Sequence, residues 1–192
     1  MKVRTFFNHF IYMFLFLLFS LFLLSKTESP CVCTTVPCPE PGYNTITMGN
    51  GGSTINYYYE LHNSYPVVIS AQGTVYNSSL SHGTETTSCT QKYSRMLDDS
   101  GLEDCDAGHI LANHLGGYGN QPLNIFPQDP TVNRGSYASF EGEIYNCILL
   151  SGKADVSWTF YYESNEHTRP NQVFYQAIFP DSCDILKETF TN

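Results

Sequence analysis

The chain has 192 residues, 14% of them charged, and a formal net charge of −9 at pH 7. A length of this order predicts one domain. Residues 30–192 hold 6 Lys or Arg and 17 Asp or Glu, which gives them a net charge of −11 (6 − 17). This acidic balance excludes attraction of a polyanion by net charge alone, so any nucleic-acid interface has to be local.

Residues 1–29 have the three-part form of a secretory signal peptide. Lys2 and Arg4 precede an apolar run at 11–24, and a polar stretch closes the segment. The run is shorter than the roughly 20 residues that a bilayer-spanning helix needs. We therefore expect a secreted, extracellular protein, with retention of the segment as a membrane anchor as the alternative.

All 7 cysteines follow the apolar run. Export favours their oxidation to disulfides, and an odd number leaves one that is free or pairs between chains. The cluster at 31–38 lacks a C-x-x-C pair and an adjacent His, so disulfides are favoured over a zinc site.

The rest of the chain divides into an irregular lead-in at 30–54, rich in Pro, Gly, Thr and Asn, and one domain at 55–192. Tyr, Val and Ile at 55–76 indicate two strands of a hairpin. The further elements expected before the centre of the chain are a loop at 77–88, a short helix at 89–98, and a strand at 107–115 that runs into a loop at 116–124.

The strongest helical pattern covers 131–150, where apolar residues recur at spacings of three and four. Pro130 precedes this helix and Ser151-Gly152 ends it. Alternating residues at 155–163 then predict a strand that pairs with 171–179. Strands, one main helix and further strands indicate an α+β domain built around an antiparallel sheet.

Candidate chemistry centres on His109, in the segment Asp106-Ala107-Gly108-His109. A neutral imidazole can accept a proton from water near pH 7. Asn133 and Glu141 are eight residues apart, about 80° around a regular helix, and their oxygens suit a hydrated Mg²⁺. If the His109 strand packs against that side of the helix, the three residues suit metal-assisted phosphodiester hydrolysis.

Three linked motifs resemble the DNA/RNA non-specific endonucleases with a ββα-metal (His-Me finger) core, in the branch that reads DAGH. They are DAGH at 106–109, NIFPQ at 124–128 and NRGSYASFE at 133–141, and a looser similarity extends over 55–180. The resemblance implies a ββα-metal catalytic core within the α+β fold, which the disulfides expected from export would staple.

The resemblance also implies roles and a cofactor. It implies Mg²⁺ or Mn²⁺, with no small-molecule cofactor. The implied roles are His109 as general base, Asn133 as direct metal ligand, Glu141 as the acid that holds metal-bound waters, Asn124 as a polar residue near the scissile phosphate, and Asp106 as the residue that orients the His strand.

Two positions depart from this pattern. Ala107 stands where many members carry Arg, and Tyr145 stands where well-known members have a basic residue one turn after the Glu. Arg134 and Arg169 are the candidate substitutes for substrate binding.

Several residues also have simpler interpretations. Asn133 is a favoured helix N-cap residue, and Glu141 fits a solvated helix face. Asn124 fits a role in holding its loop, and His114 fits a structural or exposed role.

The sequence therefore predicts a secreted, metal-dependent endonuclease of broad sequence tolerance. It would cut DNA, with RNA as a second substrate, through backbone phosphates, because no recognition helix or basic arm is evident. A protein inhibitor is a further partner that no motif identifies. The alternative is a catalytically inactive, nuclease-like extracellular binding module. The nuclease prediction requires that His109 and Asn133 face one pocket.

Overall fold

The computed structural model describes residues 33, 35–99, 105–180 and 183–192. The predicted signal segment at 1–29 lies outside these residues. In the described part of the chain, no helix has both the length and the apolar character needed to cross a membrane.

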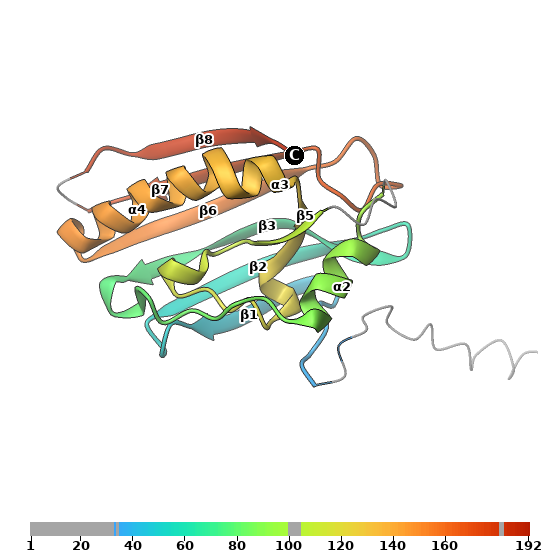
Figure 1. Ribbon diagram of the computed structural model, residues 1–192, viewed down its shortest axis with the longest axis horizontal. Coiled ribbons are helices and arrows are strands. Elements are labelled where there is room, and N and C mark those ends of the chain that lie inside the picture. Colours follow the sequence, from blue (N-terminus) through green and yellow to red (C-terminus); the bar gives the residue numbers. More distant parts are fainter. Residues whose placement is uncertain (1–32, 34, 100–104, 181–182) are drawn as a thin grey trace, which may run out of the picture. The chain divides into compact units, whose positions relative to one another are not determined.

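The main element is a six-stranded sheet in the order β1-β2-β3-β6-β7-β8, in which every neighbouring pair is antiparallel. Figure 1 shows this sheet, with the helices lying against one of its faces. Its strands are β1 (Gly42–Met48), β2 (Ser53–His62), β3 (Tyr65–Tyr76), β6 (Lys153–Tyr161), β7 (Gln172–Ile178) and β8 (Leu186–Thr191).

The expectation of an irregular lead-in over the whole of 30–54 is wrong, because β1 and the start of β2 fall within that range. β1 is an edge strand, and its outward positions are Tyr43, Thr45 and Thr47. Ile46 and Met48 are less exposed than Thr45 and Thr47 and alternate with them, so the segment carries a short apolar alternation that the expectation left out.

The two predicted hairpins are present. β2 and β3 are joined at Asn63 and Ser64, which have φ values of 46° and 70° as a tight hairpin turn requires. β6 pairs with β7, and β7 pairs in turn with β8, which had no counterpart in the sequence prediction.

A second, two-stranded sheet carries the central motif. β4 (Asp106–His109) pairs antiparallel with β5 (Ile125–Gln128). A helical segment follows at once, made of α3 (Pro130–Val132), a π-type turn η4 (Asn133–Tyr137) and α4 (Ala138–Ser151). The order strand, strand, helix confirms the ββα core.

The predicted helix at 131–150 is thus not regular. Gly135 has φ −112° and ψ −105°, which breaks the helix between Asn133 and Glu141. The 80° separation expected for a regular helix therefore does not apply. At the other end the prediction holds, because Gly152 takes the left-handed conformation, φ 82°, that ends α4.

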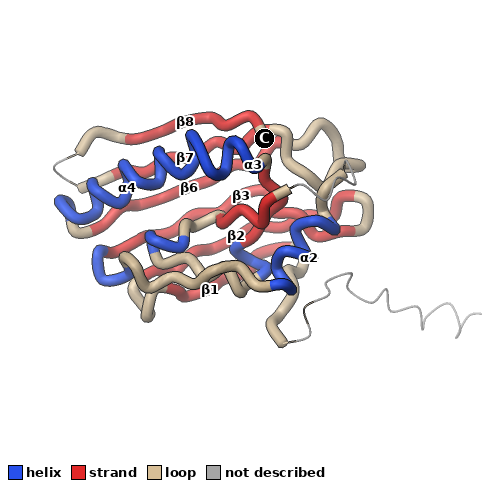
Figure 2. The backbone as a smooth tube through the Cα atoms, in the orientation of Figure 1, coloured by secondary structure: helices blue, strands red, loops and turns tan. Residues whose placement is uncertain are grey.

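The core lies between the inner face of the large sheet and the elements that cover it (Figure 2). α4 contributes Phe140, Ile144 and Ile148 to this core. The ring of Phe140 packs edge-on against Tyr175 of β7, with centroids 5.2 Å apart. Phe126 of β5 packs against Phe160 of β6 at 5.2 Å. The small sheet and α4 therefore both pack against the large sheet.

Disulfides join distant segments, as expected. Cys33 is bonded to Cys89 at the start of α2 (Ser88–Met96), and Cys147 of α4 is bonded to Cys183. Cys38 is disulfide-bonded as well. Among the described residues the free cysteine is Cys105, which is buried.

The packing of α4 on the sheet predicts a large cost for truncating Ile144, which is 0% exposed. Ile144→Ala should lower the free energy of unfolding by about 2–5 kcal/mol through lost burial and the cavity left behind. Urea denaturation followed by circular dichroism measures the change. Leu149→Ala, on the same helix but 55% exposed, is the matched control and should change stability by about 0.5 kcal/mol or less. Equal effects of the two substitutions would contradict the placement of α4.

Candidate functional site

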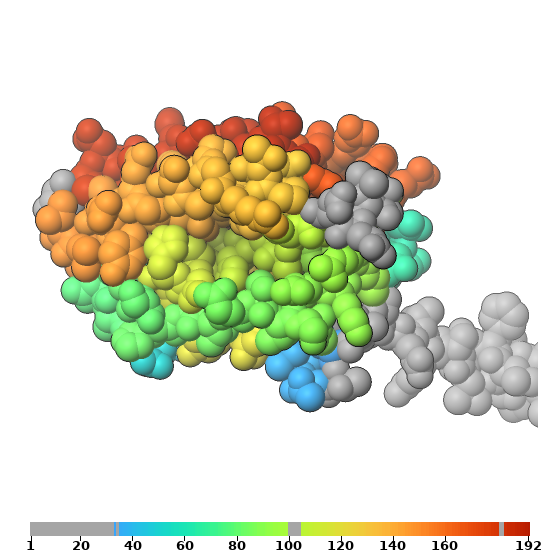
Figure 3. Space-filling model, viewed as in Figure 1, coloured from blue at the N-terminus to red at the C-terminus, as the bar shows by residue number. Residues whose placement is uncertain are grey.

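One polar cavity of about 400 Å³ lies where β4 meets the start of the helical segment and α2. Figure 3 views this face of the molecule, where the yellow-green segment that includes β4 is recessed between the green and the orange segments. Four of the residues predicted from the sequence line the cavity: Asp106, His109, Asn133 and Arg134. The structure therefore meets the requirement that His109 and Asn133 share a pocket.

The ring of His109 is held in one tautomer. Its Nε2 lies 3.1 Å from the carbonyl oxygen of Thr84, to which the Nε2 proton is donated. Nδ1 then keeps its lone pair, and within the described part of the chain it has no hydrogen-bond partner. The imidazole is thus arranged to accept a proton at Nδ1.

The same ring favours the neutral form. Burial lowers the pKa of His109 below 6.5, and the neighbouring His114 lowers it further, while the Thr84 carbonyl and the Glu85 carboxylate act in the opposite direction. The net direction is downward, so the ring is neutral at pH 7. A general base needs this state.

Gly119 makes room for the ring. A Cβ atom added at Gly119 would lie 2.5 Å from His109 Nε2 and 2.6 Å from the backbone nitrogen of Thr86. The Gly119 nitrogen also donates to the Thr84 oxygen at 2.9 Å, the same oxygen that holds the imidazole. Any larger residue would displace either the ring or the strip of backbone at 84–86.

Asn133 points its amide toward Asp106. Its Nδ2 donates to Asp106 Oδ2 at 2.8 Å. Asn133 Oδ1 has no donor among the described residues, so this oxygen is available to a ligand. The helix-cap interpretation of Asn133 is wrong, because Asp129 is the N-cap residue and accepts from Thr131 and Val132.

The carboxylate of Asp106 is fully engaged. It accepts from Arg134 Nε at 2.8 Å and from Arg134 Nη2 at 2.6 Å, in addition to Asn133. The hydrogen bonds to Asp106, and then its charge, raise the pKa of Arg134. Arg134 lies at the cavity as predicted, but its charge is matched there by a carboxylate.

Glu141 lies apart from the cavity lining. It is 7% exposed, so the interpretation as a residue of a solvated helix face is wrong. Its Oε1 is buried with no partner among the described residues, and burial raises the pKa of this carboxyl well above its usual range. Burial raises the pKa values of Tyr137 and Tyr175, and the nearby Glu141 charge raises both further.

Asn124 is fully buried and holds a loop. Its Oδ1 accepts from the Leu111 nitrogen at 2.8 Å and from the Tyr57 hydroxyl at 2.9 Å, and its Nδ2 donates to the Leu111 oxygen at 2.9 Å. This matches the loop-holding interpretation. The bonds fix the chain immediately after His109, so an influence of Asn124 on catalysis, which stays a prediction, would act through position.

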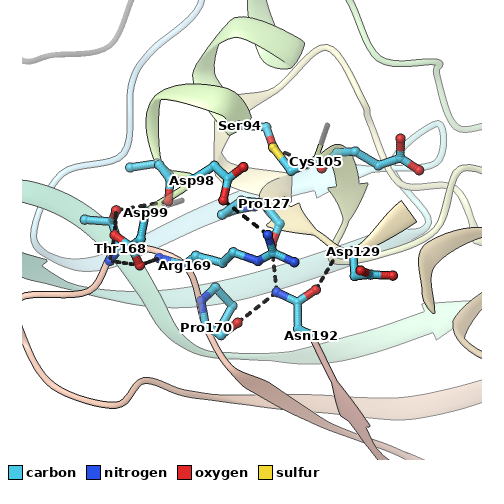
Figure 4. Close-up of polar contacts among 12 residues, drawn as sticks. Ser94, Asp98, Asp99, Cys105, Pro127, Asp129, Thr168, Arg169, Pro170 and Asn192 are labelled. Carbon is cyan, nitrogen blue, oxygen red and sulfur yellow. Dashed lines mark hydrogen bonds and ion pairs between the residues drawn. The ribbon is translucent and has the colours of Figure 1, made fainter. Parts of the chain in front are cut away.

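Arg169 lies outside the cavity lining, and Figure 4 shows its surroundings. Its guanidinium pairs with Asp98 at 3.2 Å, and its backbone nitrogen donates to Asp99. These contacts fix the loop after β6 to the end of α2. They give no support to substrate binding by Arg169, which stays a prediction.

The cavity includes residues that the sequence did not identify. Thr84 and Gly119 position the imidazole, and Glu85, Gln91 and Arg95 contribute side chains to the lining. Thr84 lies in the loop expected at 77–88, and Gly119 lies in the loop expected at 116–124. Neither residue belongs to a motif or to a stretch with an apolar period, so no sequence signal marks their approach to His109.

The residues at the cavity can be compared with what a hydrated divalent cation needs. No group of three or more His, Cys, Asp or Glu that could hold a metal occurs among the described residues. Mg²⁺, however, keeps several waters and takes few protein oxygens. The free Asn133 Oδ1 at the cavity fits that requirement as a direct ligand, while the unpartnered Glu141 Oε1 lies outside the lining.

A β-hairpin carrying the His, followed by a helical segment carrying the Asn, defines a ββα-metal fold. Residues 53–177 match the family model described as DNA/RNA non-specific endonuclease. The chain belongs to this family.

The chain is also similar to individual proteins. Over 131 residues, 68% of this chain, it is 36% identical to "Probable deoxyribonuclease RhsA" from Dickeya dadantii (strain 3937). The chain spans only 9% of the length of that relative. The metal-free crystal structure of NucA from Streptococcus agalactiae aligns with a TM-score of 0.53 and 12% identity, covering 86% of this chain and 92% of NucA, which supports the fold. The magnesium-bound NucA structure aligns with a TM-score of 0.47 and 11% identity, over 78% and 84% of the two chains.

The environment of His109 predicts a titration midpoint below 6.5, because burial disfavours its charged form. In the pH interval below about 6.5 the unfolded chain then binds more protons than the folded one, so this residue reduces stability as the pH falls and has no effect well above 6.5. A two-dimensional NMR titration of the imidazole resonances, assigned with His109→Gln, measures the midpoint. A value at or above 6.5 would contradict the described burial.

Proposed function

We propose that this protein is a metal-dependent endonuclease that hydrolyses phosphodiester bonds of DNA through backbone contacts, with RNA as a second substrate. The observation that carries the proposal is that the neutral His109, with Nδ1 free, and the free amide oxygen of Asn133 line one cavity. Family membership supports the reaction class. The similarity to a relative named as a probable deoxyribonuclease supports DNA as the first substrate to test.

His109 is the proposed general base. A water molecule in the cavity gives a proton to Nδ1 while its oxygen forms a bond to phosphorus, and the bond from phosphorus to the leaving sugar oxygen breaks. The Thr84 carbonyl holds the Nε2 proton and stabilises the imidazolium that forms. Gly119 keeps the ring in this orientation by its lack of a side chain.

Asn133 is the proposed protein ligand of Mg²⁺ or Mn²⁺, through Oδ1, with Asp106 fixing the amide orientation. A bound cation supplies charge stabilisation at the phosphate and leaving oxygens. Glu141 is the proposed acceptor for metal-bound water. Its support is the buried, unpartnered Oε1 and its position at the end of the family motif at 133–141.

We further propose that the protein is secreted. The apolar segment at 11–24 and the disulfides Cys33–Cys89 and Cys147–Cys183 support an oxidising, extracellular location. Retention of the N-terminal segment as a membrane anchor is the alternative. No small-molecule cofactor is required by the proposed reaction.

A catalytically inactive binding module is the second candidate. One observation favours it: the Arg134 charge at the cavity is already paired with Asp106, in a chain of net charge −9. Nicking of supercoiled plasmid by the oxidised protein separates the two candidates. The enzyme predicts nicking with Mg²⁺ or Mn²⁺ that EDTA abolishes, and the binding module predicts none at micromolar protein.

Removal of the base should abolish most of the activity. His109→Ala should reduce the cleavage rate by about 10²–10⁴-fold, because positioned proton transfer contributes that much. Single-turnover plasmid cleavage measures the rate. His167→Ala, at a side chain that is 42% exposed and outside the cavity lining, is the control and should cleave normally. Near-normal cleavage by His109→Ala would remove the proposed mechanism.

Removal of the proposed metal ligand should change the metal requirement. Asn133→Ala should raise the Mg²⁺ concentration for half-maximal cleavage by at least about 10-fold, as expected for a residue that holds the ion. A Mg²⁺ titration of initial cleavage rates measures the shift. Asn56→Ala, on the exposed outer face of β2, should leave the titration unchanged. If Asn133→Ala left the Mg²⁺ dependence of cleavage unchanged, Asn133 would not be the metal ligand.

A further inference from the structure

Arg95 places an unpaired positive charge at the cavity that contains His109. It lies in the last turn of α2, its side chain is exposed, and it contributes to the cavity lining. No hydrogen bond or ion pair to any described residue engages its guanidinium. A free arginine at a polar cavity is a potential anion-binding group.

The other charged side chains of the lining already have hydrogen-bond partners. Arg134 and Asp106 form a bidentate pair. The Glu85 carboxylate accepts a hydrogen bond from Asn113 Nδ2. Two acidic and two basic side chains line the cavity, so its formal charge is zero, in a chain of net charge −9. Arg95 is the cation in this lining that keeps its full hydrogen-bonding capacity.

The position of Arg95 is fixed by the residue before it. Ser94 is fully buried, and its hydroxyl donates to the backbone oxygen of Asp106 at 3.0 Å. α2 is thereby attached to β4, the strand that carries His109. Gln91, one turn earlier on the same helix face, also lines the cavity and donates to the Thr86 hydroxyl at 3.3 Å. The guanidinium is therefore presented from a rigid helix to the cavity.

On the β4 side, the cavity lacks such a group. Ala107 of β4 lines it with a methyl group only, between Asp106 and Gly108. A phosphodiester that approached His109 would meet the Glu85 carboxylate, which has an amide but no cation as its partner among the described residues, so a cation is needed to offset its repulsion. Arg95 is placed to supply it.

We propose that Arg95 forms a phosphate-binding subsite of this cavity and contacts a backbone phosphate of the bound nucleic-acid strand. The proposal deepens the proposed function and rests on it for the identity of the ligand. A guanidinium can donate two parallel hydrogen bonds to phosphate oxygens, which favours phosphodiester over a lone carboxylate of similar charge. Arg95 then affects how tightly substrate is held, and His109 affects how fast it is cut.

Binding of a fluorescein-labelled 20-nucleotide single-stranded DNA in EDTA, followed by fluorescence anisotropy from 50 to 200 mM NaCl, tests this subsite without cleavage. Arg95→Ala should weaken binding by about 10-fold, as expected for loss of a charged hydrogen-bond pair. It should also reduce the slope of log K against log [NaCl] by about 0.7, the value for one phosphate contact on a single strand. Arg95→Lys should keep the slope and recover part of the affinity.

Lys92→Ala is the matched control. Lys92 is an exposed cation on the same helix and does not line the cavity, so its loss removes the same charge from the chain. It should change affinity by less than about 2-fold, since a distant exposed charge is screened by salt. Equal effects of the two substitutions, or an unchanged salt slope in Arg95→Ala, would overturn the subsite. Equal melting temperatures of the variants exclude a structural cause.

Cleavage assays separate the two proposals. With Mg²⁺ or Mn²⁺, Arg95→Ala should raise KM by about 10-fold and change kcat by less than about 3-fold. If the wild-type protein cuts no DNA but binds it, the nuclease proposal fails and the anisotropy comparison still decides the role of Arg95. If the wild-type protein neither cuts nor binds nucleic acid, the proposed phosphate-binding subsite is contradicted as well.

Discussion

The carbonyl oxygen of Thr84 accepts two hydrogen bonds, one from His109 Nε2 and one from the Gly119 nitrogen. This oxygen fixes which ring nitrogen carries the proton, and so which one is left to accept another. The bond is available only because Gly119 has no side chain, as a Cβ there would meet the ring at 2.5 Å. The reactivity of the imidazole therefore depends on two backbone segments, at 84–86 and 117–119. They are hydrogen-bonded to each other and do not belong to the strand that carries the His.

The charge balance around this ring differs from that of the whole chain. The chain is acidic, yet its cavity lining has no net formal charge. Asp106 accepts from both Arg134 and Asn133, and this leaves the Asn133 oxygen without a donor among the described residues. One carboxylate thus fixes a potential metal ligand and balances a cation. The groups that remain unmatched are an amide oxygen, a ring nitrogen and the guanidinium of Arg95, which together suit a hydrated cation and a phosphodiester.

The two candidate metal residues differ in environment. Asn133 belongs to a break in the helical segment, where Gly135 departs from helical geometry, while Glu141 belongs to the regular helix that follows. The break changes the angle between the two side chains around the helix axis. Their spacing in the sequence therefore did not determine their relative direction. Glu141 is buried among aromatic residues instead, where its unpartnered oxygen is costly unless it is protonated or meets a partner.

The sequence by itself determined the family, the β4–β5–helix order, both hairpins and the grouping of His109, Asp106 and Asn133, because these depend on local patterns and on motifs in register. It did not reveal β1, whose apolar alternation is confined to Ile46 and Met48, nor that the Asn124 amide also bonds to the Tyr57 hydroxyl of β2. Only the tertiary structure decided that Thr84 and Gly119 meet at the imidazole and that Arg95 lines the same cavity. Their approach depends on α2 and two loops packing against β4 through long-range hydrogen bonds, such as that from Ser94 to Asp106, and such contacts leave no periodic trace along the chain.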